Sequence, residues 1–98
     1  MNTYREDFKN KLKTRIGKIE TLEMYLSDIQ DMLNFFNKKE LSNESSNELQ
    51  HGFRTSYNKE TAISNKELIT FLNILKENRE NEITELYEEL LTLKASQL

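Results

Sequence analysis

The pattern that most constrains this chain is a long helical repeat of apolar residues in its first half. Between Thr3 and Lys39 apolar residues recur every three or four positions, and no proline interrupts them. We therefore expect a helix at about residues 3–40, on the order of 55 Å long. Because a chain of 98 residues cannot surround so long a helix with a globular core, the helix must pack along a second one. Its apolar positions are Tyr4, Phe8, Leu12, Ile16, Ile19, Leu22, Leu26, Ile29, Leu33 and Phe36.

A matching repeat occupies the second half of the chain. It comprises Leu68, Phe71, Leu72, Leu75, Ile83, Leu86, Leu90 and Leu93. Arg79 stands where this repeat expects an apolar residue. We expect its aliphatic stem to lie along the helix with the guanidinium in water; the alternative is a polar residue that fixes the helix register.

The segment between the two repeats is polar and contains two candidate helix starts. Ser45 to Glu48 and Ser64 to Glu67 both match the capping-box pattern. We expect a turn at about residues 41–45 and a second helix at about 46–95, irregular near 52–64. If Ser64 is the cap instead, residues 46–58 form a short helix or an ordered loop. Either way the chain is expected to be one all-α domain, 1–98: an antiparallel two-helix hairpin with a coiled-coil-like seam.

The charges favour the antiparallel arrangement. Residues 1–18 contain six basic and two acidic side chains, whereas residues 77–89 contain six glutamates and one arginine. A hairpin turn near residues 41–45 would place the basic start beside the acidic end. Because each exposed ion pair contributes only about 0–1 kcal/mol, these charges would select orientation and register, while the apolar seams stabilise the fold.

Composition excludes several functions. There is no cysteine, and the one histidine, His51, lies in the polar segment without a nucleophile nearby, so we expect a surface or capping role for it. Carboxylates three residues apart on the first helix lack the Glu-x-x-His motif of metal-binding bundles. We therefore expect no enzyme activity, no cofactor and no metal site. The polar start and short apolar runs predict a cytoplasmic protein without signal peptide or membrane span.

Surplus apolar residues predict a binding surface. They widen the apolar stripe of each helix beyond what one neighbouring helix would cover, and a two-helix hairpin alone has a small core. We expect a protein partner or a second copy to complete the fold; the pI of 5.2 argues against nucleic acid, and no membrane contact is expected. The candidate partner-binding residues are Tyr25, Met32, Phe35, Phe36, Phe71 and Ile74, together with the acidic Glu82, Glu85 and Glu89.

In length, hairpin plan and turn position the chain resembles the helical hairpins of the WXG superfamily. These are substrates of type VII secretion and the related partners of LXG-type toxins. Gln50-His51-Gly52 stands where the family has Trp-x-Gly, and Tyr87 is followed four places on by Leu91 rather than the Asp of the secretion tail. The resemblance therefore implies an accessory partner, co-exported with the protein it binds, rather than an independently exported one.

Two functions follow from these features. The first is a non-catalytic protein-binding module, a small chaperone or targeting partner of a type VII secreted toxin. The second is an inhibitor or immunity protein from a phage or mobile element, whose acidic face at residues 77–89 would occupy a basic groove by charge complementarity.

Overall fold

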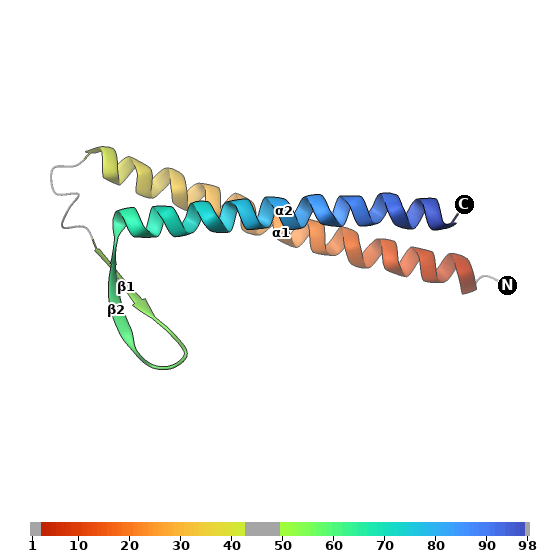
Figure 1. Ribbon diagram of the computed structural model, residues 1–98, viewed down its shortest axis with the longest axis horizontal. Helices are drawn as coiled ribbons and strands as arrows, with labels where there is room; N and C mark the ends of the chain where they lie inside the picture. The colour runs from red at the N-terminus through yellow and green to blue at the C-terminus, as the bar shows by residue number, and fades with distance from the viewer. Residues whose placement is uncertain (1–2, 43–49, 98) are drawn as a thin grey trace. The chain divides into compact units, whose positions relative to one another are not determined.

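The computed structural model describes residues 3–42 and 50–97 and consists of two long helices joined through a pair of short strands (Figure 1). In chain order these are α1 (Thr3–Ser42), β1 (Gln50–Arg54), β2 (Glu60–Ser64) and α2 (Asn65–Gln97). The helices pack against each other and run in opposite directions, so the predicted all-α hairpin is confirmed, with a small strand pair added to it.

The chain divides into two compact units, and each helix contributes a part to both. Unit 1 comprises residues 1–27 and 77–98, and unit 2 comprises residues 28–76. Unit 1 therefore holds the beginning of α1 and the end of α2. Unit 2 holds the remaining helix segments and both strands.

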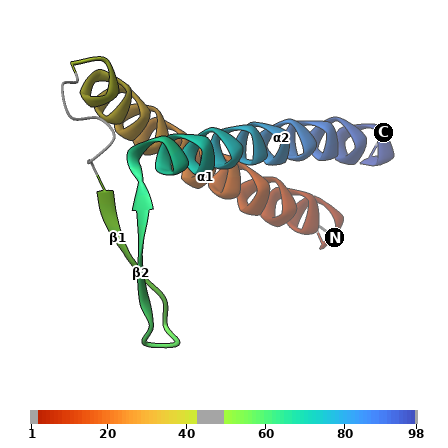
Figure 2. The same cartoon turned by 60° about the vertical axis from the view of Figure 1, so that its left-hand side comes forward.

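The two strands of unit 2 form an antiparallel hairpin that extends away from its helix segments (Figure 2). Their register pairs His51 with Ile63 and Phe53 with Thr61. The connecting turn is closed by a hydrogen bond of 2.9 Å from the Asn58 amide to the Thr55 carbonyl. Asn58 has a φ of 66°, a conformation that asparagine tolerates better than most residues.

This strand pair replaces the first part of the predicted second helix. Residues 50–54 and 60–64 are extended, so α2 begins at Asn65 and not near residue 46. The predicted turn extends beyond the described residues at 43–45, and α1 continues to Ser42. Cross-strand pairing, which joins residues as far apart as Gln50 and Ser64, decides this segment where local helical spacing does not.

The start of α2 is the second of the two predicted capping boxes. The Glu67 amide donates to the Ser64 hydroxyl over 3.1 Å, and the Ser64 amide donates to the Glu67 carboxylate over 2.8 Å. Each side chain thus satisfies an amide that the helix itself leaves free. The alternative left open by the sequence, a helix start at Ser64, is therefore the one observed, although strands take the place of the short helix or loop.

Most of the buried apolar side chains lie in unit 2. Ile29 and Leu33 of α1 and Leu72 of α2 form its core, and Phe36, Leu68, Ile69 and Leu75 pack against them. In unit 1 the one buried apolar side chain among the described residues is Ile19. Two residues of the predicted α1 seam, Tyr4 and Ile16, are exposed instead.

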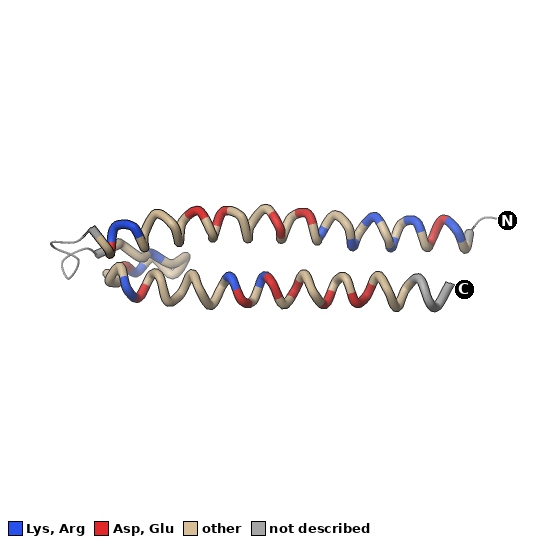
Figure 3. The backbone as a smooth tube through the Cα atoms, turned by 90° about the horizontal axis from the view of Figure 1, so that it is seen from above, with Lys and Arg blue, Asp and Glu red and all other residues tan. Residues whose placement is uncertain are grey.

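In unit 1 a cross-helix ion pair confirms the predicted charge arrangement. Arg15 Nε of α1 lies 3.0 Å from Glu89 Oε2 of α2, and the basic residues of α1 face the acidic residues of α2 in this unit (Figure 3). Arg79 forms its ion pair with Glu82 of its own helix. This pair lies within α2, and the Arg79 side chain is 28% exposed.

Candidate functional site

A buried polar junction in unit 2 connects the strand pair to both helices. It consists of His51, Asn65, Glu40 and the backbone carbonyl of Phe36. Asn65 is fully buried; its Nδ2 donates to the Phe36 carbonyl over 3.1 Å and to Glu40 Oε1 over 2.7 Å. His51 Nε2 lies 3.0 Å from Asn65 Oδ1. All polar atoms of the buried amide therefore have partners, as burial requires.

These contacts assign the proton on His51. Because Asn65 Nδ2 donates twice, Oδ1 is the acceptor, so His51 Nε2 must carry a hydrogen. The imidazole also stands edge-on to the Phe36 ring, with centroids 4.9 Å apart. A surface or capping role was expected for His51; its side chain is half-buried and contacts Asn65 of α2 and the Phe36 ring of α1. This arrangement links β1 to both helices of unit 2.

An exposed apolar face lies on the helices of unit 2. We define it as Met32 and Phe35 of α1 with Phe71 and Ile74 of α2; these side chains are 40–54% exposed. Within each pair the residues are three positions apart and therefore share one side of their helix.

Met32 and Phe71 lie on the same side of unit 2. Met32 precedes the buried Leu33 by one residue, and Phe71 precedes the buried Leu72 by one residue. In each helix, the residue before the seam residue is rotated from it by about 100° about the helix axis. Because the two helices are antiparallel, this rotation directs both side chains to the same side of the pair. Asn65 contacts Phe36 and Glu40, and Leu72 packs with Ile29 and Leu33. That register places Met32 and Phe71 at the same level, and Phe35 and Ile74 lie three positions farther along their helices.

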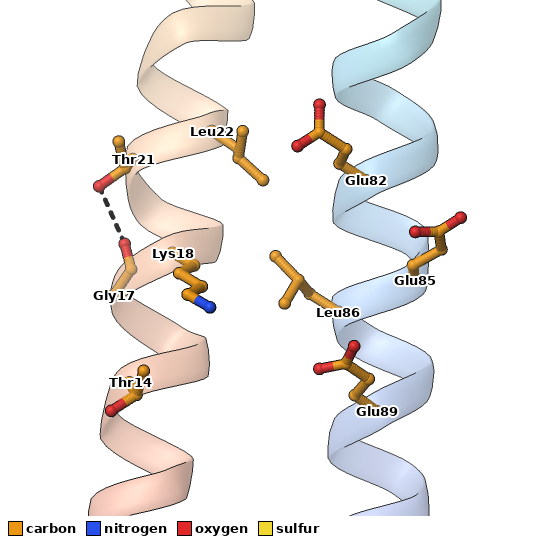
Figure 4. Close-up of a pocket in the computed structure, with 9 residues that line it drawn as sticks. All are labelled: Thr14, Gly17, Lys18, Thr21, Leu22, Glu82, Glu85, Leu86 and Glu89. Atoms are coloured by element: carbon orange, nitrogen blue, oxygen red, sulfur yellow. Dashed lines mark hydrogen bonds between the residues drawn. The ribbon is translucent and has the colours of Figure 1, made fainter.

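A groove runs between the helix segments of unit 1 (Figure 4). Its volume is about 740 Å³. Leu22 and Leu86 both point into it but are offset along the helices, so that Leu22 lies level with Glu82 and Leu86 with Lys18. The lining residues are Thr14, Gly17, Lys18, Thr21 and Leu22 of α1 with Glu82, Glu85, Leu86 and Glu89 of α2.

Small side chains account for the open space on the α1 wall. Gly17 has no side chain, and nothing would lie within 4 Å of a Cβ atom added there. Glycine inside a helix costs about 1 kcal/mol relative to alanine. The chain therefore carries a destabilising residue at a position where the described packing would accept a larger one.

Acidic side chains line the α2 wall of the groove. Glu82 pairs with Arg79 and Glu89 pairs with Arg15, whereas Glu85 has no ion pair among the described residues. A second hollow of about 510 Å³ adjoins it, and both hollows share Glu85 and Glu89.

The structure divides the predicted binding residues between four locations. Met32, Phe35, Phe71 and Ile74 form the apolar face of unit 2, and Glu82, Glu85 and Glu89 line the groove of unit 1. Phe36 packs against the core and the His51 ring, so it supports unit 2 from inside. Tyr25 is exposed in unit 1.

Sequence reasoning did not identify the α1 wall of the groove. Thr14, Gly17 and Thr21 recur at helical spacing, and this small-residue repeat was the available signal. The spacing of apolar residues does not reveal this repeat, because two of its three residues are polar.

Two kinds of feature are absent from the described residues. Within residues 3–42 and 50–97, no three His, Cys, Asp or Glu side chains are grouped so that they could hold a metal ion. Neither described helix combines the length and the apolar character needed to cross a membrane.

The chain matches no protein-family model, no curated protein and no solved structure.

Proposed function

We propose that this chain is a non-catalytic protein-binding module whose apolar face in unit 2 packs against a helix of a partner protein. The observation that carries the proposal is that Met32, Phe35, Phe71 and Ile74, all on the two helices of unit 2, are each about half exposed. Bringing such side chains out of water favours association by about 25 cal/mol per Å² of apolar area.

The partner element is a helix because the face is built from two antiparallel helices. A third helix laid along such a pair presents residues at i, i+3, i+4 and i+7 to it. The flexible thioether of Met32 can adjust to the shape of the incoming side chains. Aromatic residues such as Phe35 and Phe71 contribute large contact areas at protein interfaces.

We further propose that the partner is a toxin of the type VII secretion system and that the chain acts as its chaperone or targeting partner. Support comes from the length and the two-helix hairpin plan, which resemble the helical partners of LXG-type toxins. A hairpin that packs against a helical targeting domain would cover apolar surface on both proteins until export.

Co-expression with the product of the neighbouring gene tests the proposal. We expect a stable complex on size-exclusion chromatography with light scattering. The double variant Phe71→Gln/Ile74→Gln should weaken that complex at least tenfold, because it makes the centre of the face polar. Tyr87→Gln/Leu91→Gln is the matched control, since it changes two exposed apolar residues in unit 1.

Three results would contradict the proposal. One is a wild-type chain that stays a folded monomer at tens of micromolar with no complex formed. Another is equal weakening of the complex by the test and control variants. The third is a homodimer that Phe71→Gln/Ile74→Gln dissociates, because it would assign the face to a second copy of this chain.

A further inference from the structure

We propose that the outer edge of β1 pairs with the same edge of a second copy of this chain, so that two strand pairs form one antiparallel sheet. The two β1 strands lie in the middle of that sheet, and the two β2 strands lie at its sides. This surface is separate from the apolar face, and the inference does not depend on the proposed function.

The turn of the strand pair fixes the direction of the backbone groups in β1. The Thr55 amide donates to the Lys59 carbonyl over 3.2 Å, which makes these residues a hydrogen-bonded pair at the end of the ladder. Hydrogen-bonded and non-hydrogen-bonded pairs alternate along antiparallel strands. In the observed register, the amide and carbonyl groups of Gln50, Gly52 and Arg54 therefore point away from β2.

The two outer edges of the strand pair differ in availability (Figure 2). By the same alternation, the outward-facing residues of β2 are Glu60, Ala62 and Ser64. The Ser64 amide already donates to the Glu67 carboxylate over 2.8 Å, so the helix cap uses part of this edge. On β1, no hydrogen bond within the described part of the chain reaches the outward backbone groups of Gly52. The β1 edge is therefore the more open one.

An unpaired edge of this kind selects an extended strand as its occupant. Its donors and acceptors recur at every second residue, about 6.6 Å apart. A neighbouring strand presents its own backbone groups at the same spacing, whereas a helix has bonded its backbone groups internally. The occupant is therefore a strand.

The strand β1 is complementary to itself about a two-fold axis at Gly52. Antiparallel pairing there places Gly52 opposite Gly52 of the second copy, and Gln50 and Arg54 opposite each other. All three outward-facing residues are then hydrogen-bonded, whereas a shift of two residues leaves Gln50 or Arg54 opposite a residue outside the strand. No like charges lie opposite each other, and Arg54 keeps its ion pair with Glu60 of its own copy.

The same register brings aromatic side chains together. His51 and Phe53 are two residues apart and lie on one face of the sheet, so His51 of each copy lies opposite Phe53 of the other. Phe53 is 44% exposed, and aromatic pairs across neighbouring strands stabilise a sheet. A two-stranded hairpin is marginal by itself, whereas three or more strands with an apolar face are more stable. Pairing with a second copy therefore also stabilises β1 against β2.

Sedimentation equilibrium of the wild-type chain tests the inference. We expect a monomer–dimer equilibrium with a Kd on the order of 100 μM, because one strand edge is a small interface. Amide hydrogen exchange gives a residue-level test in the same protein. The Gly52 amide should exchange at least fivefold more slowly at about 1 mM than at about 10 μM, because only the dimer bonds it. The Ala62 amide, which faces the outer edge of β2, is the internal control and should not change.

Two proline variants locate the dimer contact. Gly52→Pro removes an outward N–H at the centre of the β1 edge and no bond to β2, so it should weaken the dimer at least tenfold. Ala62→Pro is the matched control, since Ala62 lies opposite Gly52 in the same pair and its amide points to the other edge. It should dimerise within twofold of wild type. A nuclear Overhauser contact between the His51 and Phe36 rings verifies that β1 keeps its place in each variant.

Four results would overturn the inference. One is a wild-type chain that is monomeric at about 1 mM, and another is equal protection of the Gly52 and Ala62 amides on dimerisation. The third is a dimer that Phe71→Gln/Ile74→Gln dissociates and Gly52→Pro does not, because it would place the second copy on the apolar face. The fourth is a monomer whose complex with another protein is lost in Gly52→Pro, because it would assign the edge to an extended segment of that protein. If a proline variant loses the strand pair, the exchange experiment on the wild-type chain decides.

Discussion

Units 1 and 2 are built from the same two helices, but their interiors differ. In unit 2, Ile29, Leu33 and Leu72 meet in a core, and the strand pair is joined to that core by the buried Asn65. In unit 1, Ile19 is the single buried apolar side chain among the described residues, and a groove lined by small and charged residues lies between the helices.

The difference shows that apolar spacing alone does not set the packing density. Both units have apolar residues every three or four positions. In unit 2 aromatic and branched side chains flank the seam, whereas in unit 1 Thr14, Gly17 and Thr21 occupy the side of α1 that lines the groove. We therefore expect unit 2 to provide most of the stability and unit 1 to keep the more open surface.

The largest effect should come from the core of unit 2. Leu72→Ala is expected to lower the free energy of unfolding by about 3 kcal/mol, since Leu72 is 3% exposed and its removal leaves a cavity. Ile19→Ala in unit 1 should cost less, about 2 kcal/mol, because fewer buried neighbours surround it. Urea denaturation of both variants measures the difference. Equal losses would show that the units are equally well packed.

Asn65→Leu should rank next. It removes one donor and one acceptor group that serve His51, Glu40 and the Phe36 carbonyl, and should destabilise the chain by about 2 kcal/mol because those partners stay partly buried. Amide hydrogen exchange in residues 50–64 should also accelerate. Asn73→Leu is the control, since its side chain is exposed and bonds only to the Ile69 carbonyl of its own helix. A control effect as large as the Asn65 effect would argue against the junction.

Gly17→Ala should act in the opposite direction. The added methyl meets no atom within 4 Å, so the variant gains helix propensity without a clash and should be more stable by about 1 kcal/mol. The midpoint of thermal unfolding should rise. A fall would show that the backbone near Gly17 is more closely packed than the structure indicates.

The smallest effect should come from the ion pair of Arg15 and Glu89. Their side chains are 29% and 53% exposed, so a double-mutant cycle with Arg15→Gln and Glu89→Gln should give a coupling of about 0.5 kcal/mol at low salt. The coupling should decrease further in 500 mM NaCl. A coupling above about 2 kcal/mol would mean that this pair, and not the apolar seam, holds unit 1 together.

Much of the helical architecture could be predicted from the sequence. The absence of proline and the apolar repeat predicted α1 almost to its observed end, and the basic and acidic segments predicted the orientation that Arg15 and Glu89 confirm. The start of α2 was one of two alternatives, because the two capping boxes are locally equivalent and only tertiary contacts favour one of them.

The strand pair could not be predicted in the same way. Gly52 and Asn58 permit a turn, but cross-strand pairing between residues such as His51 and Ile63 has no local periodicity that distinguishes it from an irregular helix. The sequence identified large apolar candidates such as Phe71, which the structure places at the surface of unit 2. It did not identify the groove wall at Gly17, where the signal is the lack of a side chain.

The sequence by itself determined that this chain forms two long antiparallel helices, because helical propensity, apolar spacing and opposite end charges are properties of local segments and their order. Only the tertiary structure decided which side chains meet. Burial brings together Asn65, His51 and Glu40 from three separate elements. The sizes of the side chains between the helices determine where the helices pack around a core and where a groove remains. Those features depend on pairs of distant residues, and a single helix pattern contains no information about its neighbour.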